Sequence, residues 1–250
     1  MQNRRRSRVL VPLLLASLLA PPRARAEPAA CPVVPVQHLV LPHLKAALKA
    51  GQPIVIAALG SSSTWGAMAH DIADSYPAEL QDDLARLLPE AEISVINRGV
   101  GGEDAGREDQ RMARDVLALE PTVVIWQVGA NAAARREGIG HFDRLVRRGL
   151  QRLRAAPADV ILMDNQRSRL LVASPDNRRI NRALARLAAS EHASLFSRDR
   201  LMRDWQRSGA ALDGFLATDG LHMNDRGYGC TAQALATAIT RAVRGDKRQE

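Results

Sequence analysis

Residues 54–59 read Ile-Val-Ile-Ala-Ala-Leu and are followed at once by Gly60, so that a short apolar run ends at a turn residue. Such a run, rich in β-branched residues, is typical of a buried β-strand. Longer segments separate it from similar runs further along the chain, and this alternation indicates a parallel sheet flanked by helices. The later runs lie at 93–96, 122–128, 160–163 and, more weakly, 193–196. We therefore expect an α/β fold: a single three-layer α/β/α domain with a central parallel five-stranded sheet.

Two of the separating segments have the period of amphipathic helices. Around 139–155, apolar side chains share one face and arginines share the other, and the segment around 176–191 repeats this design. We interpret the arginine faces as the solvated outer surfaces of helices that pack on the sheet, rather than as phosphate or membrane sites. The arginines in question are Arg144, Arg147, Arg148 and Arg152 in the first segment, and Arg178, Arg179, Arg182 and Arg186 in the second.

The N-terminus has the layout of a signal peptide. Four arginines within residues 4–8 precede an apolar run at 9–20, and Ala24-Arg25-Ala26 provides the small-x-small pattern that a signal peptidase accepts. The apolar run is too short to span a bilayer. We expect residues 1–26 to be a signal peptide cleaved after Ala26, 27–52 to be an N-terminal lead-in segment, and 53–250 to be the main domain. The protein would then be periplasmic or secreted, without an integral membrane span after cleavage; an uncleaved N-terminal anchor is the alternative.

The charge balance argues against a nucleic-acid partner. The whole chain has a formal charge of +8, from 35 basic and 27 acidic residues. Residues 1–26 carry six Arg and no acid, so the mature chain keeps 29 basic and 27 acidic residues and a formal charge of +2. A domain that binds nucleic acid would be expected to be strongly basic. The sequence carries no signal of an oligomeric state.

The chain has two cysteines, Cys31 near the mature N-terminus and Cys230 near the C-terminus. An oxidising compartment allows them to form a disulfide, while two buried free thiols are the alternative. A pair of cysteines alone is not a metal site. We expect neither a metal nor a cofactor.

The loops that follow the expected strands are rich in glycine and in polar side chains. In open α/β sheets, ligands bind outside the carboxyl ends of the strands. The candidate site is therefore where these loops meet. They read Gly-Ser-Ser-Ser-Thr at 60–64, Gly-Val-Gly-Gly-Glu-Asp at 99–104 and Gly-Ala-Asn at 129–131, and a late loop reads Asp-Gly-Leu-His at 219–222.

These loops contain the groups that acyl transfer needs. A serine hydroxyl requires a base within hydrogen-bond reach and a third group that orients the base. His222 and Asp219, three residues apart, can fill these roles toward Ser62. Backbone N–H groups and a side-chain amide would stabilise the oxyanion, and the Ser62 N–H, Gly102 and Asn131 can supply them. Taken singly, each residue has an ordinary explanation, such as a tight turn, a helix cap or an incidental surface histidine.

The four blocks resemble the SGNH/GDSL hydrolase superfamily over roughly residues 53–243. The segment 54–66 is similar to the family's Gly-Asp-Ser-x-Thr-x-Gly block, with Ser62 at the nucleophile, and 95–102 places Gly102 at the oxyanion glycine. Residues 129–132 resemble Gly-x-Asn-Asp, and 219–228 resemble the Asp-x-x-His block. The resemblance implies a flavodoxin-like SGNH hydrolase domain over 53–250.

Two positions depart from the family pattern. Ser61 stands where the family has the Asp of Gly-Asp-Ser, and Ala132 stands where it has the Asp of Gly-x-Asn-Asp. Neither lost carboxylate is one of the four residues named for catalysis, so we expect activity to survive. The run of three serines leaves Ser61 and Ser63 as alternative nucleophiles. A Gly-x-Ser-x-Gly elbow, which would indicate a classical α/β-hydrolase, is absent.

The resemblance implies a serine esterase that acts on a small-molecule or acylated substrate through an acyl-enzyme. A carbohydrate or cell-wall O-deacetylase, or an acetyl-transfer enzyme, is the alternative within the superfamily. The chain has only three tryptophans, Trp65, Trp126 and Trp205, which offers few platforms for stacking on sugars. A non-catalytic binding module on the same fold is a further alternative.

Overall fold

A computed structural model describes residues 30–245 of the chain, so the expected signal peptide lies outside the described residues. Its centre is a five-stranded sheet in the order β2-β1-β3-β4-β5, and each neighbouring pair of strands is parallel. The strands are β1 (Ile54–Gly60), β2 (Ile93–Gly99), β3 (Val123–Gln127), β4 (Asp159–Met163) and β5 (Ser194–Phe196). The predicted α/β fold with a central parallel five-stranded sheet is confirmed.

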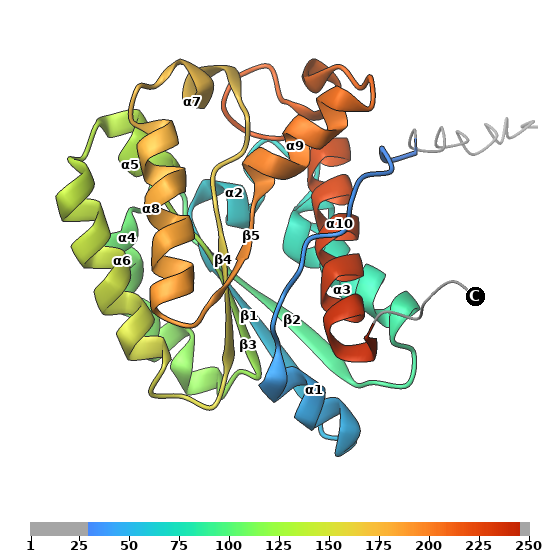
Figure 1. Cartoon of the computed structure of the whole chain (residues 1–250). Coiled ribbons are helices and arrows are strands. Elements are labelled where there is room, and N and C mark those ends of the chain that lie inside the picture. Colours follow the sequence, from blue (N-terminus) through green and yellow to red (C-terminus); the bar gives the residue numbers. More distant parts are fainter. Residues whose placement is uncertain (1–29, 246–250) are drawn as a thin grey trace, which may run out of the picture.

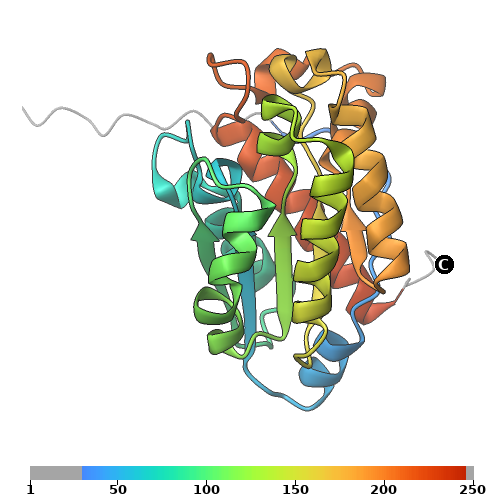
Figure 2. The ribbon, with the colours of Figure 1, turned by 90° about the vertical axis from the view of Figure 1, so that its left-hand side faces the viewer.

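Helices cover both faces of the sheet (Figure 1). One face carries α4 (Ala105–Asp115), α5 (Ala130–Arg135), α6 (Ile139–Leu153), α7 (Arg169–Ala173) and α8 (Asn177–Ser190). The other face carries α1 (Pro42–Lys49), α3 (Tyr76–Leu87), α9 (Arg198–Arg207) and α10 (Asp225–Arg244). The short helix α2 is Ser62–Trp65, and 3-10 helices lie at Ile72–Asp74, Leu117–Leu119 and Leu212–Phe215. Figure 2 shows α4, α6 and α8 side by side in front of the sheet.

The alternation of side chains along each strand builds two separate cores. Ile54, Ile56 and Ala58 of β1 belong to the core under α1, α3, α9 and α10. Ala57 and Leu59 belong to the core under α4 to α8, because successive side chains of a strand point to opposite faces. A sheet covered on both faces has strands that are apolar at nearly every position. This explains why the run at 54–59 contains no polar residue.

Three of the arginines of α6 are partly exposed and pair with acidic groups of neighbouring segments. Arg148 and Arg152 both contact Asp109 of α4, whose side chain is buried. Arg147 pairs with Glu191, which follows α8. These arginines are therefore solvated in part and also hold α4 and α8 against α6.

The expected lead-in at 27–52 packs closely against the rest of the molecule within the described residues. Leu39, Leu41 and Leu44 are buried in the core beside α10. Cys31 forms a disulfide with Cys230 of α10, with the two Cα atoms 5.4 Å apart. The lead-in thus shares the hydrophobic core of the main domain.

Between residues 30 and 245, none of the helices combines the length and the apolar character needed to span a membrane.

Candidate active site

Ser62 lies at the carboxyl end of β1, as the first residue of α2. The turn that presents it depends on two glycines. A Cβ on Gly60 would lie 2.2 Å from Thr64 Oγ1, and a Cβ on Gly99 would lie 2.1 Å from the backbone nitrogen of Trp65. Both distances are far below van der Waals contact, so only glycine allows α2 to sit this close to the ends of β1 and β2.

Two consecutive hydrogen bonds link Ser62 to His222 and His222 to Asp219. The Ser62 Oγ lies 2.7 Å from His222 Nε2, and His222 Nδ1 lies 2.5 Å from Asp219 Oδ2. The second carboxylate oxygen, Asp219 Oδ1, accepts hydrogen bonds from the backbone N–H groups of Leu221 and His222, each at 2.9 Å. The loop therefore fixes the carboxylate, and the carboxylate fixes the imidazole ring.

Asp219 has the charge state needed to orient a histidine. Its partial burial tends to raise the pKa, but the hydrogen bonds from the His222 ring and from the backbone N–H groups of Leu221 and His222 outweigh this effect. The pKa of Asp219 is accordingly lowered from its ordinary value. At neutral pH the group is a carboxylate, which accepts a hydrogen bond from His222 Nδ1–H and leaves Nε2 free to accept a proton from Ser62.

Of the three consecutive serines, Ser62 is the one whose hydroxyl faces the imidazole. The side chains of Ser61 and Ser63 are buried. Ser61 Oγ donates to Gln127 Oε1 at 3.3 Å, and Ser63 Oγ accepts from Gln166 Nε2 at 3.3 Å. The geometry thus separates the three hydroxyls, which the sequence left as alternatives.

The glycine-rich segment after β2 forms a turn with a free donor. Glu103 N–H contacts the Val100 carbonyl at 3.4 Å, and Gly102 has φ +77°, a conformation that favours glycine in such a turn. Within the described residues, neither the Gly102 N–H nor the Ser62 N–H has a hydrogen-bond acceptor. Both donors remain available to a ligand.

Asn131 lies in the first turn of α5 and reaches the same glycine-rich segment. Its Nδ2 donates to the backbone carbonyl of Glu103 at 2.6 Å. An amide NH₂ group has two donors, so the second remains for a ligand. The structure therefore links the Asn131 side chain to the residue next to Gly102.

Three further polar residues hold these loops, and none of them stands in one of the four sequence motifs. Gln127 ends β3, and its Oε1 accepts from Ser61 N–H, Ser61 Oγ and Thr64 Oγ1 at 3.2–3.3 Å. Gln166 Nε2 donates to the carbonyl of Leu221, next to His222, at 2.8 Å. Arg111, in α4, contacts the ends of β1 and β2. A signal for Gln127 was present, because it is polar within an otherwise apolar strand.

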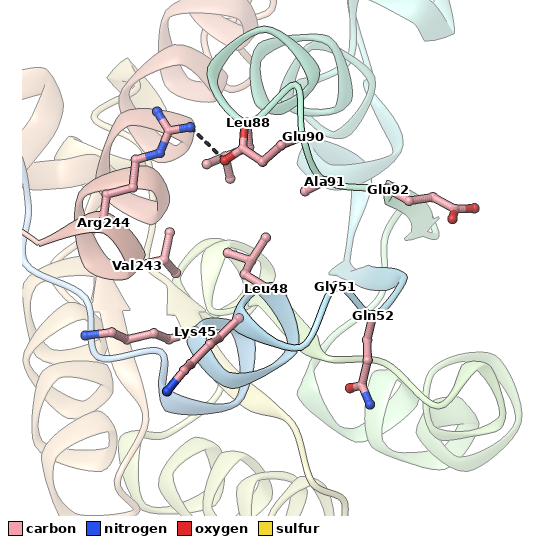
Figure 3. Close-up of a pocket in the computed structure, with 11 residues that line it drawn as sticks. Lys45, Leu48, Gly51, Gln52, Leu88, Glu90, Ala91, Glu92, Val243 and Arg244 are labelled. Carbon is pink, nitrogen blue, oxygen red and sulfur yellow. Dashed lines mark hydrogen bonds and ion pairs between the residues drawn. The ribbon is translucent and has the colours of Figure 1, made fainter.

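Two observations bear on other kinds of site. Within residues 30–245, no group of three or more His, Cys, Asp or Glu side chains is arranged to hold a metal ion. A pocket of about 360 Å³ is lined by residues such as Lys45, Glu90 and Arg244 (Figure 3). It adjoins the segments that lead into β1 and β2, and so lies at the opposite end of these strands from Ser62.

Comparison with known proteins agrees with the resemblance found in the sequence. Residues 28–245 match the model of the Non-GDSL lipase-like family. A search among curated proteins gave no match. The word "Non-GDSL" fits the Gly-Ser-Ser at 60–62, where a GDSL protein has Gly-Asp-Ser.

Solved structures share the fold at low sequence identity. A two-domain esterase active on acetylated mannans aligns with a TM-score of 0.70 and 21% identity, over 83% of this chain and 55% of its own. The psychrotrophic esterase EstA from Pseudoalteromonas sp. aligns with a TM-score of 0.64 and 19% identity, over 76% and 99%. The acetyl xylan esterase AlAXEase gives 0.61 and 20%, over 74% and 100%. The present chain thus spans about half the length of the two-domain esterase.

Proposed function

The chain belongs to the Non-GDSL lipase-like family, within the SGNH/GDSL-like hydrolases, and on this premise we propose that it is a serine esterase that cleaves a carboxylic ester through an acyl-enzyme. The observation that carries the proposal is a pair of consecutive hydrogen bonds. One joins Ser62 Oγ and His222 Nε2 at 2.7 Å, and the other joins His222 Nδ1 and Asp219 Oδ2 at 2.5 Å. A serine hydroxyl that hydrogen-bonds to a histidine oriented by a carboxylate is the arrangement that makes serine nucleophilic.

The proposed reaction proceeds in two steps. His222 Nε2 takes the proton of the Ser62 hydroxyl while Oγ attacks the ester carbonyl, and the imidazolium then gives that proton to the leaving alcohol. In the second step His222 activates a water molecule, which attacks the acyl-enzyme and releases the acid and free Ser62. The Ser62 N–H, the Gly102 N–H and the free Asn131 amide hydrogen stabilise the negative carbonyl oxygen in both steps.

The two departures from the family pattern leave this machinery in place. Neither Ser61 nor Ala132 takes part in the contacts among Ser62, His222 and Asp219. Gln127 accepts hydrogen bonds from both the N–H and the hydroxyl of Ser61, and so fixes the turn at the position where the family has aspartate. This supports a working enzyme rather than a binding module derived from one.

A second candidate function is the removal of acetyl groups from a glycan. Trp65 supports it, because this side chain is 53% exposed and lies three residues after Ser62 in α2. Residues three apart share a helix face, and an exposed indole there offers a stacking surface for a sugar ring. Two of the structures with the same fold are esterases described as active on acetylated mannans or xylan.

Hydrolysis assays with the purified protein test both candidates. We expect turnover of p-nitrophenyl acetate, and heat-inactivated protein is the control for non-enzymatic hydrolysis. Release of acetate from acetylated mannan or xylan, with kcat/KM above that for the small ester, would support the glycan substrate. Activity on p-nitrophenyl acetate without acetate release would reject it. No turnover of either kind, in folded protein, would contradict the esterase proposal.

We also propose that residues 1–26 are removed during export, leaving 27–52 as the lead-in to the enzyme domain. The Cys31–Cys230 disulfide supports a periplasmic or secreted location, because disulfides persist in oxidising compartments. The intact mass of the protein recovered from the periplasm or medium should correspond to a chain that begins at Glu27. A mass that retains residues 1–26 would contradict the proposal.

A further inference from the structure

Arg111 is a nearly buried cation at the point where the ends of two strands meet the glycine-rich turn. Its side chain is 8% exposed. Nη2 donates to the carbonyls of Gly60 at 3.2 Å and Arg98 at 2.8 Å, which lie at the carboxyl ends of β1 and β2. Nε donates to the Glu103 carboxylate at 2.6 Å, and Nη1 contacts Asp115 at 3.3 Å.

The contact with Glu103 continues to Asn131. Arg111 binds the side chain of Glu103, and the backbone carbonyl of the same residue accepts the hydrogen bond from Asn131 Nδ2 at 2.6 Å. Glu103 directly follows Gly102 and precedes Asp104, which caps α4. Arg111 lies on that same helix, so the helix holds the residue that orients the Asn131 amide.

We infer that Arg111 is a positioning residue for the oxyanion-binding groups, and that it acts through Glu103 on the Asn131 amide. The inference rests on the proposed esterase function. Oxyanion donors act only when they are held where charge develops, and a misplacement of about 1 Å can cost about 100-fold in rate. Within the described residues, the side chain of Glu103 pairs only with Arg111. Without that contact, nothing else in this part of the chain fixes the carboxylate of Glu103.

The planar guanidinium explains why arginine suits this position. Its nitrogen atoms point in different directions and here reach two carbonyls and two carboxylates at once. Lysine keeps the charge but donates from a single atom, so it cannot hold the two strand ends and Glu103 together. We expect Arg111→Lys to lower kcat for p-nitrophenyl acetate about 10- to 100-fold and to change KM less than about threefold.

A double-mutant cycle with Asn131→Ala tests whether Arg111 acts through the Asn131 amide. If Arg111 acts through Asn131, Arg111→Lys lowers kcat in the wild-type background but changes it less than about twofold when Asn131 is already alanine. Glu103→Ala is measured in the same cycle, because it breaks the same contact and leaves the Arg111 contacts to the strand ends in place. If Arg111→Lys does not fold, Glu103→Ala alone decides the result.

Arg148→Lys is the matched control, since it alters an ion pair with Asp109 of the same helix without touching the glycine-rich turn. It should keep the wild-type kcat. An Arg111→Lys or Glu103→Ala effect that is undiminished in the Asn131→Ala background would overturn the inference, as would an unchanged kcat in both single variants. These outcomes are measured in active enzyme, so they are distinct from a failure of the proposed function, in which the wild-type protein itself would be inactive.

Discussion

Ser62→Ala is expected to lower kcat/KM for p-nitrophenyl acetate by about 10⁵- to 10⁶-fold, the loss typical of a serine hydrolase without its nucleophile. The variant lacks the oxygen that lies 2.7 Å from His222 Nε2, and no other described hydroxyl contacts that atom. Steady-state kinetics measure the loss, and circular dichroism confirms that the variant is folded. We expect a folded protein, because alanine removes one partly exposed hydroxyl.

The adjacent serines provide matched controls for this result. Ser61→Ala and Ser63→Ala remove the same hydroxyl from neighbouring positions, but these hydroxyls bind Gln127 and Gln166 rather than His222. We expect each to reduce activity by less than about tenfold, since a neutral hydrogen bond contributes roughly 1 kcal/mol. A variant at position 61 or 63 that loses all activity, beside a Ser62→Ala protein that keeps it, would contradict the assignment.

Asp219→Asn is expected to lower kcat by about 10³- to 10⁴-fold while leaving the fold intact. In this variant an NH₂ group replaces either Oδ2 or Oδ1. An NH₂ group in place of Oδ2 donates to His222 Nδ1 and so favours the wrong tautomer. An NH₂ group in place of Oδ1 faces the N–H groups of Leu221 and His222. In both cases Nε2 is a poorer base toward Ser62. The measurement is kcat with p-nitrophenyl acetate at saturating substrate.

Asp213→Asn is the control for Asp219→Asn. Asp213 is an exposed carboxylate in the same region of the chain and pairs with Arg169 on the surface. The control should retain full activity, since exposed ion pairs contribute little to stability. An Asp219→Asn enzyme with wild-type kcat would show that this carboxylate does not orient His222.

The inner strands β1, β3 and β4 are readable from sequence because burial on both faces imposes apolar residues at nearly every strand position. Helices 139–153 and 177–190 are readable because one face of each is polar. Helix α10 carries no such signal: half of its residues are buried, and many of them are alanine or glycine. Helix α4 is harder still, because it buries Glu108, Asp109 and Arg111 against other parts of the chain. Local periodicity reports burial by apolar residues and does not detect buried charge.

The site residues also divide into those that stand in recognisable sequence motifs and those that do not. Ser62, Gly102, Asn131, Asp219 and His222 stand in short motifs, so their chain order alone suggests that they meet. Gln127 and Arg111 act through partners that are 66 and 51 residues away, respectively. Such pairings depend on strand order and register, which the sequence alone does not specify. The sequence marks Gln127 only as a polar residue in an apolar strand, and its contacts with Ser61 and Thr64 follow from the fold.

The most direct test of the central claim is to locate the adduct of a fluorophosphonate probe by peptide mass spectrometry. Such a probe reacts with a serine whose hydroxyl is activated by a base. We predict a single adduct on Ser62 in the wild-type protein, with no adduct in Ser62→Ala and greatly slowed labelling in His222→Ala. A folded wild-type protein that does not react, or an adduct on Ser61, Ser63 or any other residue, would contradict the assignment of Ser62 as the nucleophile.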